Sequence, residues 1–181
     1  MKRTALILAM YTFPVLAFAA SGNTISFKGQ VSDQTCQVSV NGNAANPIIL
    51  LPTVAASDLS AVGSTAGQTP FTIAVSGCTA PTSGLAIKTT FLGKDVTTAG
   101  NLGNSSGATK GGATNVQIQL MDADKGGKPV VLNGITSVAG LALAAGEQTA
   151  SHDFAVRYIS ETGGATAGTV SASAQYSLDY L

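Results

Sequence analysis

The sequence matches a catalytic motif at Gly103–Gly107, which reads Gly-Asn-Ser-Ser-Gly. This Gly-x-Ser-x-Gly string is the form of the turn that presents a nucleophilic serine in α/β hydrolases, and Asp122 or Asp124 and then His152 follow in hydrolase order. The motif requires a strand before the serine and a helix after it, whereas Ser105 lies in a run rich in Gly, Ser and Thr. We therefore favour a surface loop over a catalytic triad, with a secreted hydrolase as the alternative from another functional class.

A second segment, which begins at Asp122, starts like a calcium-binding loop. Its fifth position is Gly126, and its twelfth is Asn133 where the motif needs a bidentate Glu, so a hairpin turn explains the segment better. The single His152 and two cysteines supply too few soft ligands for a zinc site. We predict that the protein has no catalytic residues, no metal and no cofactor.

Residues 1–19 have the features of a secretory signal peptide. Lys2 and Arg3 precede an apolar run that ends in Ala17-Phe18-Ala19, a small-residue pattern typical of a cleavage site. The apolar run is shorter than the ~20 residues that a membrane-spanning helix needs. We expect cleavage after Ala19, which leaves a mature chain of about 162 residues, the size of one domain.

The mature chain carries few charges, and they are scattered. Charged residues make up 10% of the sequence, and loss of Lys2 and Arg3 leaves a net charge of about −2. A nucleic-acid binder would cluster Lys and Arg to displace counterions, and attachment to anionic lipid would need a basic amphipathic segment. The composition therefore argues against both classes.

Cys36 and Cys78 are the only cysteines, and both follow the signal peptide in a chain bound for an oxidising compartment. One disulfide is the simplest interpretation, and two free buried thiols are the alternative. The bond would close a loop of about 43 residues, which the chain-entropy model values at roughly 4 kcal/mol.

Apolar and polar residues alternate along the mature chain, which is the pattern of half-buried β-strands. The clearest example is residues 170–180, where Val170, Tyr176, Leu178 and Tyr180 share one face. Shorter runs with the same period occur at 71–75, 85–91, 116–120 and 154–158.

Turn-forming residues separate these runs, and no internal repeat or linker divides the chain. Residues 100–114 are low in complexity, which predicts a mobile surface loop or a subunit contact. The Ala-rich stretch at 54–66 permits a short helical turn. Several short strands with irregular spacing predict an all-β sandwich.

Near the mature N-terminus, residues 23–31 read Asn-Thr-Ile-Ser-Phe-Lys-Gly-Gln-Val. The residues that fall on one side of this extended strand are Ile25, Phe27, Gly29 and Val31. Later segments add to this one: Phe71–Cys78, Ala113–Leu120, Phe154–Tyr158, Gly168 fourteenth from the end, and the penultimate Tyr180. In this order and spacing, the mature chain resembles the major pilins of the bacterial chaperone-usher pathway, in the type 1 fimbrial group.

The resemblance implies an incomplete immunoglobulin-like β-sandwich that is completed by donor-strand exchange. Residues 20–32 would be the N-terminal donor-strand extension and residues 33–181 the pilin domain. Ile25, Phe27 and Val31 would enter the groove of a neighbouring subunit, and Gly29 would leave room for a backbone at a shallow part of that groove. An ordinary turn or bulge glycine is the other interpretation of Gly29.

The resemblance also implies that a C-terminal strand forms one wall of the groove. Its assembly residues would be Gly168, Val170, Tyr176, Leu178 and Tyr180, although Tyr180 is equally explained as a core residue. A periplasmic chaperone would cover the groove first, and another subunit's extension would replace it at an outer-membrane usher by strand addition. A lone subunit would be prone to aggregate, because an open sheet edge and apolar side chains would face water together.

We therefore predict the repeating major subunit of a chaperone-usher pilus, exported through the periplasm to a fimbrium on the bacterial cell surface, where it supports adhesion. Its partners would be identical subunits, the chaperone, the usher and a tip adhesin. A minor adaptor pilin is the nearest alternative, since it would share the fold. A terminating pilin would lack the donor extension, and a tip adhesin would need a second domain for which the chain has no room.

Overall fold

The computed structural model describes residues 29–34, 36–45, 47–123 and 127–181. The chain divides into two compact units, residues 1–30 and residues 31–181, and every strand of the described residues lies in the second. The predicted signal peptide and most of the predicted donor extension lie outside the described residues. Within the described part, no helix is both long and apolar enough to cross a membrane.

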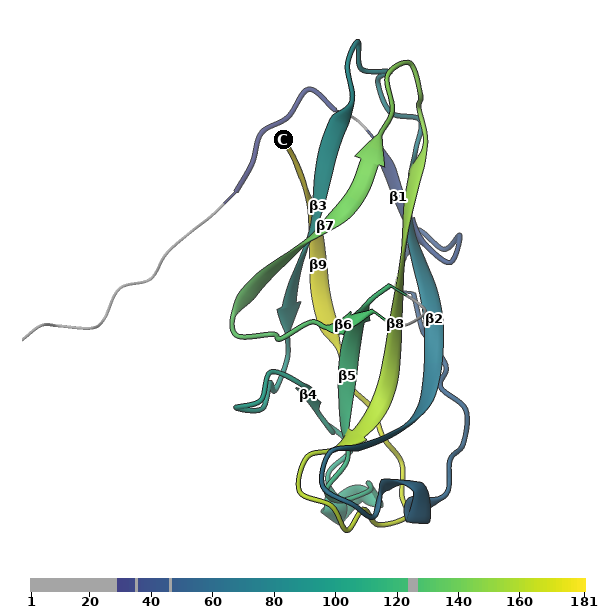
Figure 1. The fold of residues 1–181 in the computed structure, drawn as a ribbon, viewed down its shortest axis with the longest axis vertical. Coiled ribbons are helices and arrows are strands. Elements are labelled where there is room, and N and C mark those ends of the chain that lie inside the picture. The colour runs from purple at the N-terminus through teal and green to yellow at the C-terminus, as the bar shows by residue number, and fades with distance from the viewer. Residues whose placement is uncertain (1–28, 35, 46, 124–126) are drawn as a thin grey trace, which may run out of the picture. The chain divides into compact units, whose positions relative to one another are not determined.

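The second unit is built from two β-sheets (Figure 1). In the larger sheet the strands are β1 (Gln37–Val40), β2 (Ser64–Ser76), β8 (Ala150–Ser160), β5 (Gln117–Asp122) and β4 (Leu102–Gly103), in that spatial order, and β6 (Lys128–Pro129) pairs with β5. The smaller sheet has the order β7 (Ile135–Leu143), β3 (Leu85–Gly93) and β9 (Ala174–Tyr180). All the ladders between these strands are antiparallel. This arrangement confirms the all-β sandwich expected from the alternating sequence.

The core lies between the two sheets and is centred on Phe154 of β8, which is fully buried. The Phe154 ring stacks on Phe71 of β2, with centroids 5.6 Å apart, and meets the edge of Phe91 of β3 at 5.3 Å. Because β3 belongs to the smaller sheet, this aromatic group joins the two layers. Alternation along β2, β3 and β8 thus places one face of each strand in a common core.

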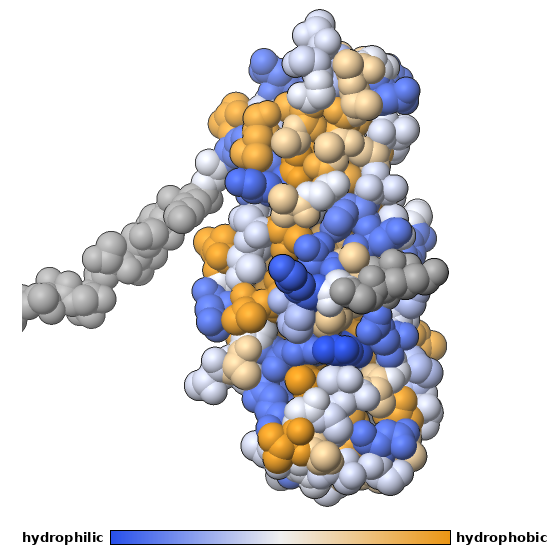
Figure 2. Space-filling view, viewed as in Figure 1, coloured by the Kyte–Doolittle hydropathy of each residue, from blue (hydrophilic) through white to orange (hydrophobic). Residues whose placement is uncertain are grey.

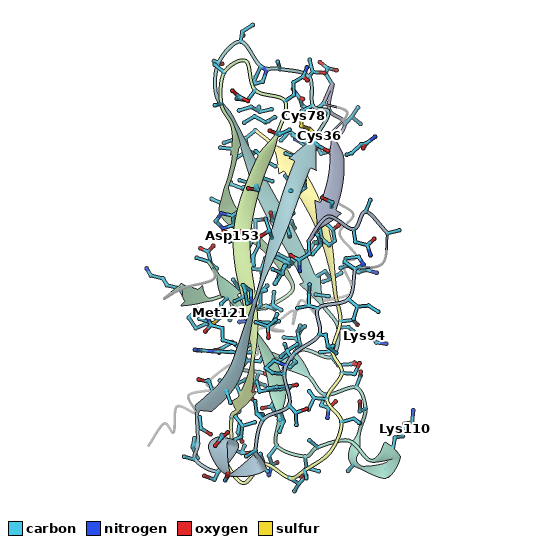
Figure 3. The ribbon with its side chains drawn as sticks, turned by 90° about the vertical axis from the view of Figure 1, so that its right-hand side faces the viewer. Cys36, Cys78, Lys94, Lys110, Met121 and Asp153 are labelled. Atoms are coloured by element: carbon cyan, nitrogen blue, oxygen red, sulfur yellow. A yellow bond between two sulfur atoms is a disulfide. The ribbon has the colours of Figure 1, made fainter. Side chains whose placement is uncertain are left out.

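The disulfide between Cys36 and Cys78 is present, which confirms that expectation. It joins the residue before β1 to a residue just after β2, and Cys78 is buried beside Val75. Figure 3 shows both cysteines near one end of the sandwich, while Lys110 of the 3-10 helix η2 (Ala108–Lys110) lies near the other. The bond therefore fixes the path of the chain as it enters the larger sheet.

The predicted runs at 71–75, 85–91 and 154–158 fall in β2, β3 and β8, and the run at 116–120 matches β5 from its second residue onward. The strand predicted at 170–180 is shorter in the structure, where β9 begins at Ala174. The short helical turn expected within 54–66 is η1 (Ala56–Leu59). Strand β7 was not predicted, because its alternation changes phase. Its pairing with β3 shifts between Ile87 and Thr89, so that Val138 and Leu141, three positions apart, both pack against the core.

Residues 100–114 form more structure than the surface loop that their composition predicts. They contain β4 and η2, and Gly112 and Ala113 are buried. Backbone hydrogen bonds join this segment to residues 169–171, which lead into β9. Residues 100–114 therefore support the C-terminal segment that leads into β9.

Candidate assembly site along the free edge of β9

β9 lies at the edge of the smaller sheet and pairs with β3 on one side only. The amide of Lys94 donates to the carbonyl of Ser173, and the amide of Leu181 donates to the carbonyl of Ala86. In an antiparallel ladder, residues that bond to the partner strand alternate with residues whose backbone groups point away. The odd-numbered residues from 173 to 181 therefore face β3, and Ala174, Tyr176 and Leu178 direct their N–H and C=O groups to the open side.

The same alternation continues upstream of β9. The carbonyls of Thr169 and Ser171 accept hydrogen bonds from the amides of Ala113 and Ser105, at 2.9 and 2.8 Å. Val170 and Ala172, by contrast, make no backbone hydrogen bond with any described residue. Residues 169–180 thus form one extended edge, which we call the acceptor edge. Its odd-numbered residues bond inward through their backbone, and its even-numbered residues from Val170 to Leu178 have no backbone partner on the open side among the described residues.

The even-numbered residues of the acceptor edge also carry the side chains that point to the core. Val170, Ala172, Tyr176 and Leu178 all pack against the main hydrophobic cluster, yet each keeps part of its surface exposed. On the adjacent strand β3, Ile87 is only 1% exposed. The core is therefore less completely covered along this edge than one strand further in.

Tyr180 completes this row of side chains at the C-terminal end. It packs against the cluster around Val75 and Leu141. Burial raises the pKa of the Tyr180 phenol above its usual value, because the charged phenolate would lose contact with water. Tyr180 is thus a core residue by its contacts, and its role in assembly stays a prediction.

Residues 47–53 also pack against the core without backbone partners among the described residues. Ile49 and Leu51 pack against the core, whereas Ile48 and Leu50 are each 86% exposed. Val38 of β1 and Leu178 of β9 both pack against the same two hydrophobic clusters. Figure 2 shows that apolar surface is exposed elsewhere on the domain as well, in patches between polar residues.

Gly168 lies where the chain enters the acceptor edge, and its backbone contacts residues 112 and 113 closely. A Cβ atom at this position would lie 2.3 Å from the amide nitrogen of Ala113 and 2.5 Å from the carbonyl carbon of Gly112. A side chain here would therefore push the edge away from the segment that supports it. The sequence singled out Gly168 by its position fourteenth from the end. The close packing explains why this position needs a glycine, and its role in assembly stays a prediction.

The predicted donor residues are only partly described. Ile25 and Phe27 lie outside the described residues. Gly29 has no atom within 4 Å of the place that a Cβ would occupy, and the side chain of Val31 is fully exposed. Their assignment as donor-strand residues remains a prediction.

The residues of the hypothetical catalytic triad take other roles. The Ser105 hydroxyl donates a hydrogen bond to the carbonyl of Ser171 at 2.9 Å. The His152 Nε2 atom pairs instead with an Asp122 carboxylate oxygen, also at 2.9 Å, and the ring meets the edge of Phe154. Asp124 lies outside the described residues. Ser105 and His152 share no hydrogen bond, so His152 does not activate Ser105.

The His152 ring occupies the space left by Gly140 of β7, where a Cβ would lie 2.3 Å from its Cε1 atom. This contact joins β8 to β7, and the hydrogen bond to Asp122 joins β8 to the end of β5. Within the described residues, no group of three potential metal ligands occurs. The arrangement is structural: it closes the side of the sandwich opposite the acceptor edge.

Comparison with known proteins places this fold in a single class. The family model described as "Fimbrial protein" matches residues 25–181. The F17 fimbrial protein of Escherichia coli is 34% identical over 92% of this chain and 94% of its own length. The minor fimbrial subunit HifD of Haemophilus influenzae is 34% identical over 99% of this chain and 82% of its own.

Among solved structures, the P pilus rod subunit PapA aligns with a TM-score of 0.59 and 20% identity, over 80% of this chain and 99% of that one. At this identity the likeness shows the fold, an incomplete immunoglobulin-like sandwich. The fold and the open edge therefore define a pilin. With the family match, the chain belongs to the fimbrial protein family of chaperone-usher pilus subunits. These are structural proteins that polymerise into fimbriae on the bacterial surface and are not enzymes.

Proposed function

We propose that this chain is the repeating major subunit of a pilus shaft and that it polymerises by donor-strand exchange. Residues 20–32 of one copy would pair with the acceptor edge of another. The observation that supports this proposal most is that the acceptor edge lacks, among the described residues, both backbone partners on its open side and full coverage of its apolar side chains. From Val170 to Leu178, the residues whose backbone groups have no partner among the described residues are the same residues whose apolar side chains are incompletely covered.

The N-terminal sequence suits this edge. Ile25, Phe27 and Val31 recur with the two-residue period of a strand, so all three side chains would enter the core together. Burying them at roughly 1.5 to 3 kcal/mol each, with several ladder hydrogen bonds at about 1 kcal/mol net, gives on the order of 10 kcal/mol before the cost of ordering the strand. That is enough to hold two subunits together without any covalent bond.

A subunit with an open acceptor edge needs protection before it polymerises. We infer that a periplasmic chaperone covers the edge, that an outer-membrane usher exchanges the chaperone for the next subunit, and that a tip adhesin ends the filament. Exposed strand edges and apolar patches drive aggregation, which is the physical reason for such a partner.

The same chemistry fits a minor adaptor pilin, and the similarity to the minor subunit HifD over 99% of this chain favours keeping that candidate. The two roles differ in abundance. We expect this chain to be the dominant protein of filaments sheared from the cell surface, as measured by quantitative mass spectrometry. A few copies per filament would assign it to the adaptor role instead.

Deletion of residues 20–32 tests the donor role directly. We expect the truncated subunit to accumulate without forming filaments, and a synthetic peptide that copies residues 20–33 to raise its unfolding temperature. A peptide with Phe27 replaced by Asp is the matched control, because it keeps the backbone bonds but buries a charge. Filaments of normal length from the truncated chain would refute donor-strand exchange through this segment.

A further inference from the structure

The Gly103–Gly107 segment has no catalytic role, yet one of its side chains makes four hydrogen bonds. Asn104 uses both polar atoms of its amide twice. Its Nδ2 donates to two carbonyls and its Oδ1 accepts from two amides: Ala113 O at 2.9 Å, Thr169 O at 2.9 Å, Ser106 N at 3.1 Å and Ser171 N at 2.9 Å. Four bonds are all that a primary amide can make, so the orientation of Asn104 is fixed.

These four bonds join two segments that are distant in sequence. Two of them hold residues 100–114 together, and the other two reach Thr169 and Ser171 at the start of the acceptor edge. The Ser105 amide and hydroxyl add two bonds to the Ser171 carbonyl. We call Asn104 and Ser105, with these contacts, the Asn104 clamp.

Close backbone packing fixes the geometry of the clamp. A Cβ at Gly168 would lie 2.3 Å from the Ala113 nitrogen, and a Cβ at Gly112 would lie 2.6 Å from the Gly107 carbonyl oxygen. The Thr169 amide also bonds to the Gly111 carbonyl at 3.0 Å. The two segments are therefore in backbone contact, with no side chain between them to adjust their spacing.

The clamp acts on one side of the acceptor edge and leaves the other side free. Every bond that it makes to this segment goes to Thr169 or Ser171, whereas the backbone groups of Val170 and Ala172 point the opposite way and have no partner among the described residues. Residues 169–173 have no regular strand beside them, since β9 and its ladder with β3 begin at Ala174. The hydrogen bonds of the clamp hold residues 169–173 in place where a neighbouring strand would otherwise do so.

We propose that Asn104 is a positioning residue for assembly, which holds residues 169–173 extended so that the N-terminal strand of a second copy can pair with Val170 and Ala172. This inference rests on the proposed strand exchange and deepens it. A template that is already extended does not have to be ordered when the partner strand arrives, which favours both the rate and the strength of pairing.

The test uses filaments of the full-length chain and hydrogen–deuterium exchange read at single residues. Asn104→Asp is the main variant, because it keeps the size of the side chain but sets a carboxylate oxygen against the carbonyls of Ala113 and Thr169. Asn115→Asp is the matched control. The Asn115 side chain donates only to Gly164 at 3.2 Å, outside the acceptor edge.

We expect the Val170 and Ala172 amides to exchange on the order of 10- to 100-fold faster in Asn104→Asp filaments, from the loss of two donated hydrogen bonds. Exchange at Tyr176 and Leu178, and throughout the Asn115→Asp filaments, should match the unmodified protein. Equal acceleration along all of β9 would show general destabilisation and overturn the proposal, as would no change at Val170 and Ala172.

Two further results separate this inference from the proposed function. If unmodified filaments exchange freely at Val170 and Ala172 but not at Tyr176 and Leu178, the clamp inference is wrong and strand exchange at β9 stands. If all four amides exchange freely, the acceptor edge itself is wrongly assigned. Should Asn104→Asp yield no filaments, Ser105→Ala, which removes only the hydroxyl bond to Ser171, must give a smaller acceleration at the same two amides, and its absence overturns the proposal.

Discussion

Replacement of Ala172 by Pro separates the stability of the subunit from the stability of the junction between subunits. Proline removes one backbone N–H, and the Ala172 N–H has no partner among the described residues. Proline is also tolerated where the N–H side of an edge strand faces solvent. The isolated subunit should therefore lose little stability, whereas a donor strand loses one of the donors with which it pairs.

The size of the effect follows from hydrogen-bond energetics. Each junction loses a bond worth about 1 kcal/mol net, and the donor carbonyl left without a partner adds about 1 to 3 kcal/mol. The total of about 2 to 4 kcal/mol corresponds to dissociation roughly 30- to 700-fold faster, at about 1.4 kcal/mol for each factor of ten. Release of subunits from purified filaments in denaturant, followed over time, measures this rate.

Ser171→Pro is the matched control, one residue away on the same extended segment. Its amide donates to the Asn104 side chain at 2.9 Å within the subunit, so its loss should lower the yield of the subunit itself. The reasoning is refuted if Ala172→Pro filaments dissociate at the unmodified rate, or if the two proline variants lower subunit yield equally.

Four other changes have expected outcomes. Gly29→Leu should slow or block polymerisation while subunit yield stays normal, and normal filaments by electron microscopy would contradict the donor assignment of Gly29. Cys36→Ser removes a cross-link worth roughly 4 kcal/mol, so periplasmic yield should fall sharply, and equal yield with and without reductant would argue against this role. Phe154→Ala should destabilise the subunit by about 3 to 5 kcal/mol in chemical unfolding, because it empties the contact between the two sheets; a loss below about 1 kcal/mol would contradict the packing. Because burial raises the pKa of the Tyr180 phenol above its usual value of 10.0, the folded state favours the neutral phenol. Stability should be intact below pH 10 and fall as the pH rises towards the folded-state pKa, and Tyr180→Phe should flatten that dependence.

The sequence predicts most strands of this fold because their alternation is continuous. In β8, for example, Phe154, Val156 and Tyr158 keep a strict period of two and all face the core. β7 escapes this method, because a register shift puts Val138 and Leu141 on the same face with Gly140 between them. A search for apolar residues at every second position does not detect a strand whose register shifts by one residue.

The acceptor edge was predictable in part. The alternation at residues 170–180 identified the core-facing side chains, but not which of the two hydrogen-bonding edges would be free. The role of Asn104 could not be found locally, since Ser171, one of its partners, is 67 positions away and composition alone describes Gly103–Gly107 as a loop. The disulfide was easier to predict, because the chain offers only one pair of cysteines.

The acceptor edge also explains why a donor strand should need strict alternation. Val170, Ala172 and Leu178 each combine a free backbone with an inward side chain, so a strand that completes the ladder must complete the core at the same time. A slip of one residue in the register would reverse every donor side chain. It would turn Phe27 to solvent and direct Lys28 into the core, where an unpaired charge costs several kcal/mol. The energetic gap between the two registers therefore exceeds the value of any single hydrogen bond, so under the proposed strand exchange we expect the side chains rather than the backbone to set the register between copies.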